Sequence, residues 1–364
     1  MKRKMILASV LTFLSIIPML YSGLFLGASK DPYGNMDKLP VALVEGEDTI
    51  VKDKLIESKL FDIKKEKNLD LACKDLEDGT VYSIISFDND FQNSLKNYPR
   101  TQKSPSINLT ISEGLNYFSS KVITSTMKQF VDKVNTNLSQ TMISKMKGMG
   151  IPETASNMIQ LNIKDIHPVK NNAEAMAPYL FSLTLFVGTI FVNQFIMRNL
   201  KKKGESLFIY WTKQFLIPFS IGIMQVLLLI LGNKLFIHVP MTSLFELGAF
   251  LFLTSATFSS IIVGFNKLIP GIGSLIVLLL TMLQTSSAAG VYPIILSKKL
   301  FQFINNCLPM TYSIKGLRSI LSLNGINLIN NVYVLIVFFI LGQILILISY
   351  LIHEKKFRAI AENN

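Results

Sequence analysis

Apolar and polar residues alternate along this chain in long blocks rather than in short runs. The first apolar block, Met5–Gly27, carries no charge and follows a basic start. Five more lie in the second half of the chain: Met176–Met197, Phe215–Leu231, Leu244–Phe265, Ile269–Ala289 and Leu328–Ile352. A transmembrane helix needs about 20 apolar residues. We therefore predict an α-helical polytopic membrane protein with six transmembrane helices, one in residues 1–27 and five in residues 176–364.

The polar block at residues 28–175 has the periodicities of a folded domain. Helical spacing of apolar residues covers Asp70–Glu77, and from Leu115 it continues to Met146 before Gly148. Three short runs have the pattern of strands: Leu39–Val44, Val81–Phe87 and Ile107–Ile111. We predict an α+β domain with a long amphipathic helix. The apolar stripe of that helix is expected to pack on the strands, and the alternative is a surface that binds a partner.

Composition agrees with a membrane protein, because 50% of the 364 residues are hydrophobic and the mean hydropathy is +0.41. The net charge of +12 would be typical of nucleic-acid binding if it were spread over the polar domain. Residues 28–175 are nearly neutral, however, and the basic excess lies at the ends of the apolar blocks. Lys and Arg at such positions orient helices and meet anionic lipid. The lipid bilayer, and no nucleic acid, is the expected partner.

The positions of the basic residues also predict the orientation. An apolar block of this length in residues 1–27 favours a retained anchor over a cleaved signal peptide. With both termini in the cytoplasm, twelve basic residues lie inside and five lie in short outside loops: Lys234, Lys298, Lys299, Lys315 and Arg318. We predict a multi-pass protein of the cell membrane with residues 28–175 outside the cell. An ATPase could then reach only the segments Arg198–Glu205 and Phe265–Leu268.

Catalytic and metal-binding motifs are missing from the sequence. There is no Walker A loop, no HExxH and no GxSxG, and the three histidines are far apart. Cys73 and Cys307 stand at neither metal nor redox spacing. We therefore predict no enzyme activity, no cofactor, no catalytic residue and no metal site. If ATP drives this protein, a separate chain must bind it.

The segment Leu283–Arg318 is too apolar for a loop and too charged for a transmembrane helix. It turns at Gly290–Pro293 and continues with Lys298, Lys299, Lys315 and Arg318 among apolar residues. Such a composition is typical of a segment at a membrane surface, with its cations reaching the head groups. We expect it to be an extracellular interfacial segment between the last two transmembrane helices.

Two stretches of the sequence have specific motifs that a membrane protein does not need in general. KDPYGNMDKLPVALVEGED begins at Lys30 and contains the turn Asp31, Pro32, Tyr33 and Gly34 before the expected strand at residues 39–44; LACKDLEDGTVYSIISFDNDFQNSL begins at Leu71. Pro and Gly in a four-residue turn end a helix where it leaves the bilayer. Both stretches resemble the N-terminal domain of the YhgE/Pip (phage infection protein-like) family. The soluble domain is much shorter than in long members of that family.

The second half of the chain resembles the membrane domain of type-2 ABC exporters, to which the YhgE/Pip family is related. The resemblance is carried by Gln225 and by seven further residues: Tyr292, Pro293, Leu308, Pro309, Thr311, Tyr312 and Arg318. It implies short helices that re-enter the outer leaflet between the last two transmembrane helices. Ser287–Gly290 stands in place of the usual glycine-rich turn, and Lys298–Lys299 stands where a proline is common.

Ionisable residues are scarce inside the predicted transmembrane helices. Lys213 and Glu246 fall near helix starts, and the other polar residues are small or amides. Ser255 and Ser259 have the spacing of close helix packing, which we prefer to a polar pathway. Without buried charge, a proton relay or an ion filter is not indicated. This favours an amphipathic or lipid-like substrate.

Two functional hypotheses follow. The first is a permease subunit that resembles a type-2 ABC exporter, forms a homo- or heterodimer and works with a separate ATP-binding subunit. Its candidate ATPase-contact loop is Lys201, Lys202, Lys203, Gly204 and Glu205, which is equally compatible with a plain positive anchor. The second, implied by the family, is a surface-exposed anchor or receptor of the phage infection protein type, or an accessory protein of type VII secretion.

Overall fold

The computed structural model describes residues 16–145, 157–197, 206–241 and 243–362. It divides the chain into two compact units. The α/β unit comprises Asp31–Asn171 and Val291–Leu296, and the membrane unit contains Met1–Lys30, Asn172–Gly290 and Ser297–Asn364. The candidate ATPase-contact loop, residues 201–205, lies outside the described residues.

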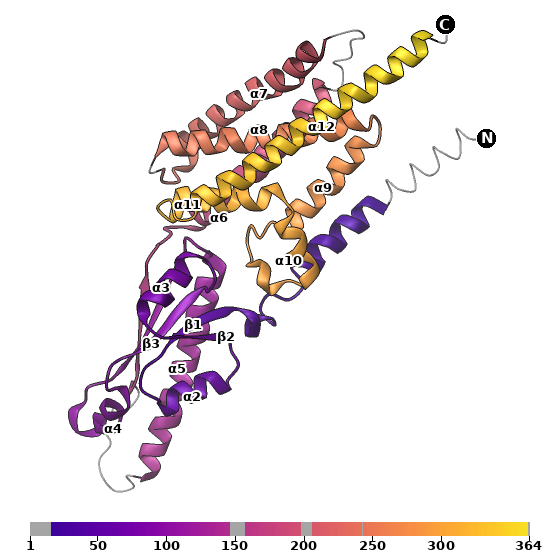
Figure 1. The fold of residues 1–364 in the computed structure, drawn as a ribbon. Coiled ribbons are helices and arrows are strands. Elements are labelled where there is room, and N and C mark those ends of the chain that lie inside the picture. The colour runs from indigo at the N-terminus through magenta and orange to yellow at the C-terminus, as the bar shows by residue number, and fades with distance from the viewer. Residues whose placement is uncertain (1–15, 146–156, 198–205, 242, 363–364) are drawn as a thin grey trace. The chain divides into compact units, whose positions relative to one another are not determined.

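A five-stranded mixed sheet forms the centre of the α/β unit (Figure 1). Its strands are β1 (Pro40–Val44), β2 (Asp62–Glu66), β3 (Ser83–Phe87), β4 (Ser106–Ile111) and β5 (Gln160–Asp165). They lie in the order β2-β1-β3-β4-β5. β1 runs parallel to both β2 and β3, β4 is antiparallel to β3, and β5 is parallel to β4. The three predicted strands are β1, β3 and β4.

Helices cover both faces of this sheet. They are α2 (Ile50–Glu57), α3 (Leu69–Glu77), α4 (Phe91–Thr101) and α5 (Tyr117–Lys145), with a 3₁₀ turn, η1, at Met36–Lys38. Alternate residues of β1 point to opposite faces, so Val41 and Leu43 pack with α2 and α5, whereas Ala42 packs with α3. The expectation that the apolar stripe of the long helix packs on the strands is confirmed for Met127 and Val134.

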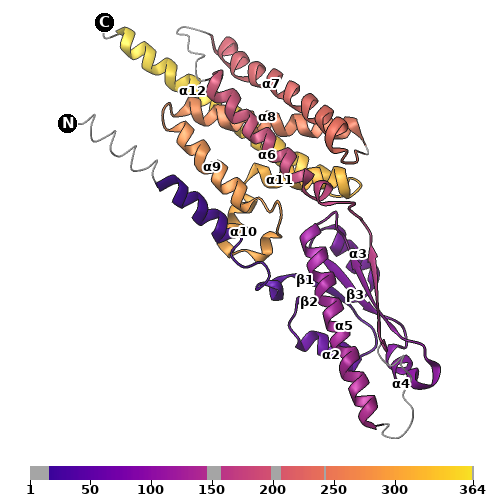
Figure 2. The same cartoon turned by 180° about the vertical axis from the view of Figure 1, so that it is seen from behind.

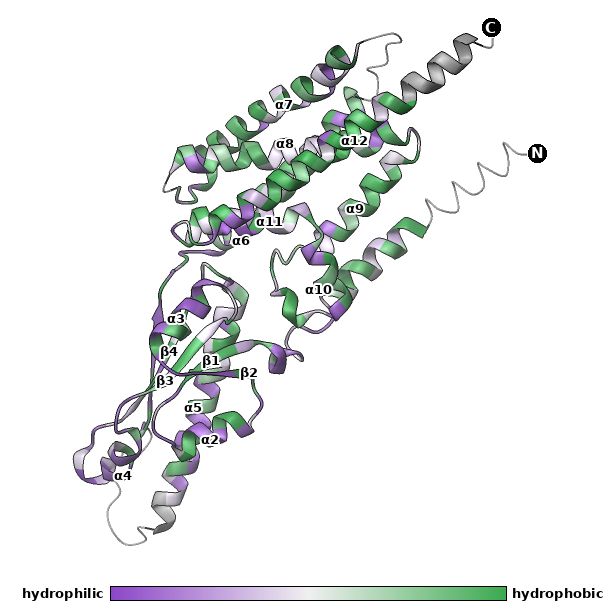
Figure 3. Ribbon diagram, viewed as in Figure 1, coloured by the Kyte–Doolittle hydropathy of each residue, from purple (hydrophilic) through white to green (hydrophobic). Residues whose placement is uncertain are grey.

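The membrane unit consists of apolar helices (Figures 2 and 3). Four are long and apolar enough to cross a membrane: α6 (Asn172–Phe195), α7 (Leu207–Gly232) with its continuation η4 (Asn233–Ile237), α8 (Leu244–Leu268) and α12 (Leu328–Glu362). Two described apolar helices are shorter, Ile16–Ala28 and α9 (Gly273–Ser287). Four of the six predicted transmembrane helices are therefore found as long helices, and the other two stay predictions.

α8 is the central helix of the membrane unit. Of its most apolar window 83% is buried, and it packs against α6, α7, α9, α11 and α12. Small residues allow these close approaches, because a Cβ at Gly342 of α12 would lie 2.6 Å from the Ser260 backbone. A Cβ at Gly222 of α7 would lie 2.5 Å from the Ser255 hydroxyl. Ser255 thus packs against a neighbouring helix, as its spacing predicts.

Two short helices join α9 to α12, namely α10 (Lys299–Asn306) and α11 (Pro309–Ser322), after a 3₁₀ turn, η5, at Ile294–Leu296. α10 fits the expected interfacial segment, because Leu300 and Phe303 are 63% and 69% exposed beside the exposed Lys298 and Lys299. α11 differs from α10, because most of its residues are buried against α6, α8 and α12. Its position at a membrane surface stays a prediction.

Candidate functional site

The α9–α10–α11 region contains most of the residues that carried the resemblance to type-2 exporters. α9 ends at Ser287, and Ala289 follows with a positive φ of 57°. The guanidinium of Arg318 donates from one nitrogen to the carbonyls of Ala289 and Gly290, at 3.1 and 2.8 Å. These two carbonyls lie just past the last residue of α9, where the partial negative charge of the helix end favours a nearby cation. Arg318 of α11 therefore holds the turn that follows α9.

Glycine is required at two positions of this region by close aromatic neighbours. A Cβ at Gly290 would overlap the ring of Tyr179 on α6, and a Cβ at Gly316 of α11 would overlap the ring of Phe250 on α8. Gly290 is the last residue of Ser287–Gly290, which departs from the usual glycine-rich turn. The residue of this turn that the Tyr179 ring approaches is nevertheless a glycine.

The start of α11 is held by a buried amide. Pro309 is the first helical residue, where its missing N–H costs nothing. The next N–H, that of Met310, donates to the Gln284 side-chain oxygen of α9 at 3.2 Å. Gln284 is fully buried and its amide nitrogen has no partner among the described residues. This pairing fixes the start of α11 against α9.

A second buried amide, Asn305 of α10, joins the same three helices. It donates to the Ser287 carbonyl at 2.6 Å and to the Thr311 hydroxyl at 3.0 Å. Thr311 in turn donates to the Asn305 carbonyl at 2.7 Å, and Tyr312 donates to the Asn306 carbonyl at 2.9 Å. The motif residues Pro309, Thr311 and Tyr312 are thus brought together at the α10–α11 turn.

The motif pair Tyr292–Pro293 lies elsewhere, in the segment Val291–Leu296 that belongs to the α/β unit. We name this segment the strap. The ring of Tyr292 meets the ring of Phe118 edge-on, with 4.7 Å between centroids. The ring of Tyr33, from the first motif, meets the same Phe118 at 5.3 Å. Two motifs more than 250 residues apart therefore converge on one aromatic side chain.

The first motif forms the turn that the sequence predicts. The Asp31 carboxylate accepts the N–H of Gly34 at 2.8 Å, and the Asp31 carbonyl accepts the side chain of Asn35 at 2.7 Å. These two hydrogen bonds hold the turn in place. It brings the chain from the end of the first described helix into η1 and β1.

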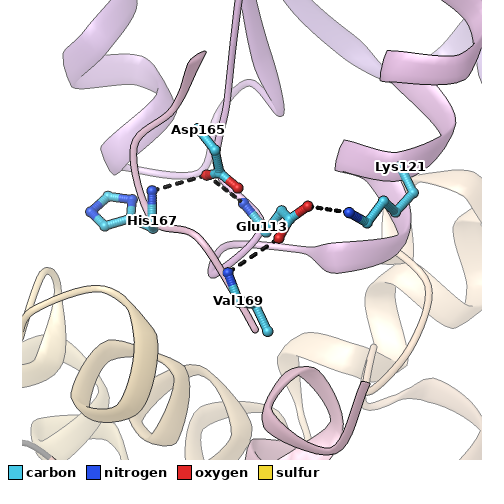
Figure 4. A network of polar contacts seen from close by, with 5 residues as sticks. All are labelled: Glu113, Lys121, Asp165, His167 and Val169. Carbon is cyan, nitrogen blue, oxygen red and sulfur yellow. Dashed lines mark hydrogen bonds and ion pairs between the residues drawn. The ribbon is translucent and has the colours of Figure 1, made fainter. Parts of the chain in front are cut away.

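Figure 4 shows a polar network where the chain leaves the sheet of the α/β unit. The carboxylate of Glu113, which is 8% exposed, binds Lys121 and accepts the N–H of Val169 at 3.1 Å. One oxygen of Asp165 accepts the N–H of Glu113 at 3.3 Å and that of His167 at 3.0 Å. The network fixes the segment after β5 to the turn between β4 and α5.

Burial changes the proton affinities in this network. It raises the pKa of Asp165, against two backbone hydrogen bonds that lower it. It lowers the pKa of His167, whose ring nitrogen pairs with the Ser112 hydroxyl at 3.0 Å. The bond to Glu113 raises the pKa of Lys121. Within the described residues no group of three or more side chains could hold a metal ion.

Side-chain hydrogen bonds join α8 to the end of α6, and join α12 to both α7 and α8. Lys267, near the end of α8, donates to the Met197 carbonyl just after α6 at 2.7 Å. It thereby joins the end of α8 to the residues that directly follow α6. Trp211 of α7 donates to Gln343 of α12 at 2.9 Å, and Gln343 donates to Ser260 of α8 at 2.7 Å.

Several residues of this region were not found from sequence. Glu113 and Asn116 precede α5 in a polar turn of ordinary composition, and Phe118 was assigned only to the stripe of the long helix. Asn305 is followed directly by Asn306, and nothing in the sequence marks one of the two as a buried donor. Gln225, expected from the exporter pattern, approaches Gly188 of α6 so closely that a Cβ there would lie 2.8 Å from its amide.

Comparison with known proteins agrees with this arrangement. Residues 8–351 match the family described as "ABC-2 family transporter protein". The chain belongs to this family. It is therefore a membrane protein of the transporter permease type. Permeases of this family are membrane components of transporters rather than enzymes, and they usually work with an ATP-binding subunit.

The expected relation to YhgE is confirmed as well. The chain is 30% identical over 161 residues to the protein described as "Uncharacterized protein YhgE" of Bacillus subtilis (strain 168). The match covers 44% of this chain but only 21% of that relative. No solved structure matches this chain.

Proposed function

We propose that this chain is the permease subunit of a type-2 ABC exporter. It would act as a homo- or heterodimer with a separate ATP-binding subunit and move an amphipathic or lipid-like substrate outward. The observation that carries the proposal is the family match, which spans both units of the chain. The compact α9–α10–α11 region supports it, because the resemblance to exporters predicts short helices between the last two transmembrane helices.

The placement of charge supports the substrate class. In the four candidate membrane spans, which are Asn172–Phe195, Leu207–Ile237, Leu244–Leu268 and Leu328–Ile352, the charged residues lie within two turns of a span end: Glu174, Lys213, Lys234, Glu246 and Lys267. The middle of α8 instead buries hydroxyls, among them Thr254 and Thr257. Ion-coupled transporters keep ionisable groups at the middle of the membrane. A path lined by hydroxyl, amide and apolar groups suits a molecule with a polar head and an apolar body.

The proposed topology puts both termini in the cytoplasm and the α/β unit outside the cell. The ATP-binding subunit would then meet the basic loop Lys201–Glu205 together with the end of α8. The hydrogen bond from Lys267 to Met197 supports this site, because it joins the flank of that loop to the second cytoplasmic segment.

Co-purification tests the proposal. The tagged chain is purified in mild detergent, and a partner is identified by mass spectrometry through a Walker A peptide. Replacing Lys201, Lys202 and Lys203 by Gln removes three charge attractions of roughly 0.2–1 kcal/mol each. We expect the partner's affinity to fall roughly three- to 150-fold. The matched control replaces Lys64, Lys65 and Lys67 of the α/β unit, three exposed lysines of similar spacing.

Recovery of the chain without any Walker A protein contradicts the proposal. Equal recovery from both triple variants contradicts the contact loop only.

The alternative function is that of a surface receptor or secretion accessory, in which the α/β unit binds a partner. It is favoured by the two hydrophobic cores that the α/β unit forms by itself. Mapping loss of function distinguishes the two. Damage confined to exposed residues of the α/β unit favours the receptor, whereas damage from Thr311 or Arg318 variants favours transport.

A further inference from the structure

The chain passes between the two units at four positions, after residues 30, 171, 290 and 296. The last two crossings enclose the strap, Val291–Leu296, so a piece of the loop between α9 and α10 is built into the α/β unit. Three connecting segments therefore join the units: the Asp31–Gly34 turn, the stretch Asp165–Asn171 and the strap. All three are held by one ten-residue segment of the α/β unit, Ser112–Lys121, which we name the hub.

Phe118 of the hub holds two of the three connections. Its ring lies between Tyr33 of the first connection and Tyr292 of the strap, and both contacts are edge-on, at 5.3 and 4.7 Å. Edge-to-face pairs add specific attraction to the burial of the rings. Phe118 itself packs on the core of the α/β unit. The Asp31–Gly34 turn and the strap thus both pack on the same side chain, that of Phe118.

Other hub residues hold the backbone of the connections. Asn116, which is 4% exposed, donates to the Val291 carbonyl at 3.4 Å. The Glu113 carboxylate accepts the N–H of Val169 in the remaining connection. At the far end of the strap, Leu296 is 4% exposed and belongs to the same core as Phe118. The strap is therefore an integral part of the α/β unit.

The residues on either side of the strap are fixed within the membrane unit. Gly290 precedes it and is bound by Arg318 of α11. Ser297 follows it and donates to the Ala28 carbonyl, at the end of the first described helix, at 2.6 Å. Six residues thus lie between two anchored points. If α9 shifts relative to α10, the strap must therefore either detach from the hub or move together with it.

We propose that the hub couples the α/β unit to the α9–α10 connection, with the strap as the connecting element. The strap stays docked on Phe118 and Asn116 while the membrane helices rearrange, so the α/β unit moves with the α9–α10 connection. This goes beyond the proposed function and does not depend on an ATP-binding partner, because every contact involved lies in this chain. Its test can succeed or fail independently of the co-purification experiment.

Amide hydrogen exchange of the full-length chain in detergent, measured by mass spectrometry, tests the coupling. Phe118→Ala changes only the hub, yet we expect it to increase exchange in the strap and in α10 roughly two- to tenfold, the range that one lost edge-to-face pair allows. Tyr292→Ala, on the strap side, should increase exchange in the hub peptide Ser112–Lys121. Phe118→Leu keeps an apolar side chain in the core and covers the case that Phe118→Ala fails to fold.

The matched control is Phe87→Ala. Phe87 makes an edge-on pair with Phe91 at 5.1 Å and packs on the same core, but none of its ring contacts involves the strap or the other connections. It should loosen the sheet and leave exchange in α10 unchanged. If Phe118→Ala and Phe118→Leu alter the strap and α10 no more than Phe87→Ala does, the coupling is refuted. The same holds if Tyr292→Ala leaves the hub unchanged.

Discussion

Replacing Arg318 by Gln tests the structural account of the α9–α11 junction. The guanidinium binds the carbonyls of Ala289 and Gly290, at the point where the chain leaves α9 with a positive φ. Gln is shorter and neutral, so it removes both the hydrogen bonds and the favourable charge. The two carbonyls of the turn after α9 then lose their charged donor, beside a helix end that favours a cation.

The expected loss is about 2–4 kcal/mol of unfolding free energy. Both carbonyls are bound by one nitrogen, so we count a single charge-assisted interaction worth about 1.5–3 kcal/mol. The positive charge at a helix end adds about 0.3–1 kcal/mol. Arg318→Lys keeps the charge but replaces the planar group by a compact ammonium. Arg318→Lys should therefore lose about half as much unfolding free energy as Arg318→Gln.

Equilibrium unfolding in mixed micelles of a mild detergent and dodecyl sulfate measures these differences. The control is Lys315→Gln, one turn earlier on α11, which loses an exposed contact with the Tyr312 ring at 5.7 Å worth about 0.5–1 kcal/mol. If the unfolding free energy of Arg318→Gln lies within about 0.5 kcal/mol of that of the unmodified chain, as for ordinary surface substitutions, the role of Arg318 in holding the turn after α9 is refuted.

Three further predictions concern other parts of the chain. Gly316→Ala forces a methyl group into an aromatic ring and should cost about 1–3 kcal/mol in the same unfolding assay, whereas Gly232→Ala, with open space around it, should be neutral. Because burial lowers the pKa of His167, the unfolded chain takes up that proton first as the pH falls through about 6.5. Stability should therefore decrease from pH 7.5 to 5.5, and His167→Gln should flatten this dependence. Trp211→Phe leaves the Gln343 oxygen without its donor and should cost about 1–2 kcal/mol; equal stability of this variant would contradict the interhelical bond.

The regular elements with strong periodicity could be predicted from the sequence. β1, β3 and β4 lie inside the sheet, and their buried residues give a clear apolar pattern. α3 has Asn68 as an N-cap and Gly79 after its end, which mark its limits. The long apolar helices follow from hydropathy alone, because a bilayer demands uninterrupted apolar length.

The edge strands could not be predicted in this way. β2, with the sequence DIKKE, and β5, with QLNIKD, lie at the two edges of the sheet and expose most of their residues. Charged residues on edge strands are common, since they discourage pairing with other chains. They also remove the alternation of apolar and polar residues from which strands are predicted. Without β2, the parallel pairing of β1 with β2 could not be predicted either.

The candidate site was predictable as a set of residues but not as an arrangement. The composition around Lys315 and Arg318 is that of an interfacial helix, yet α11 is buried because α6, α8 and α12 cover its apolar side. Likewise, nothing local marks the strap as part of the α/β unit. Its assignment rests on Phe118, which lies more than 170 residues earlier in the chain. Such tertiary partners leave no periodic signal.

Native mass spectrometry of the complex purified in mild detergent tests the central claim most directly. We predict a species whose mass contains two permease chains, either two copies of this chain or one copy and a related chain, together with ATP-binding chains. Added ATP and magnesium should be hydrolysed by that species and not by this chain alone. A preparation that contains this chain without an ATP-binding protein, and that shows no hydrolysis, would contradict the account.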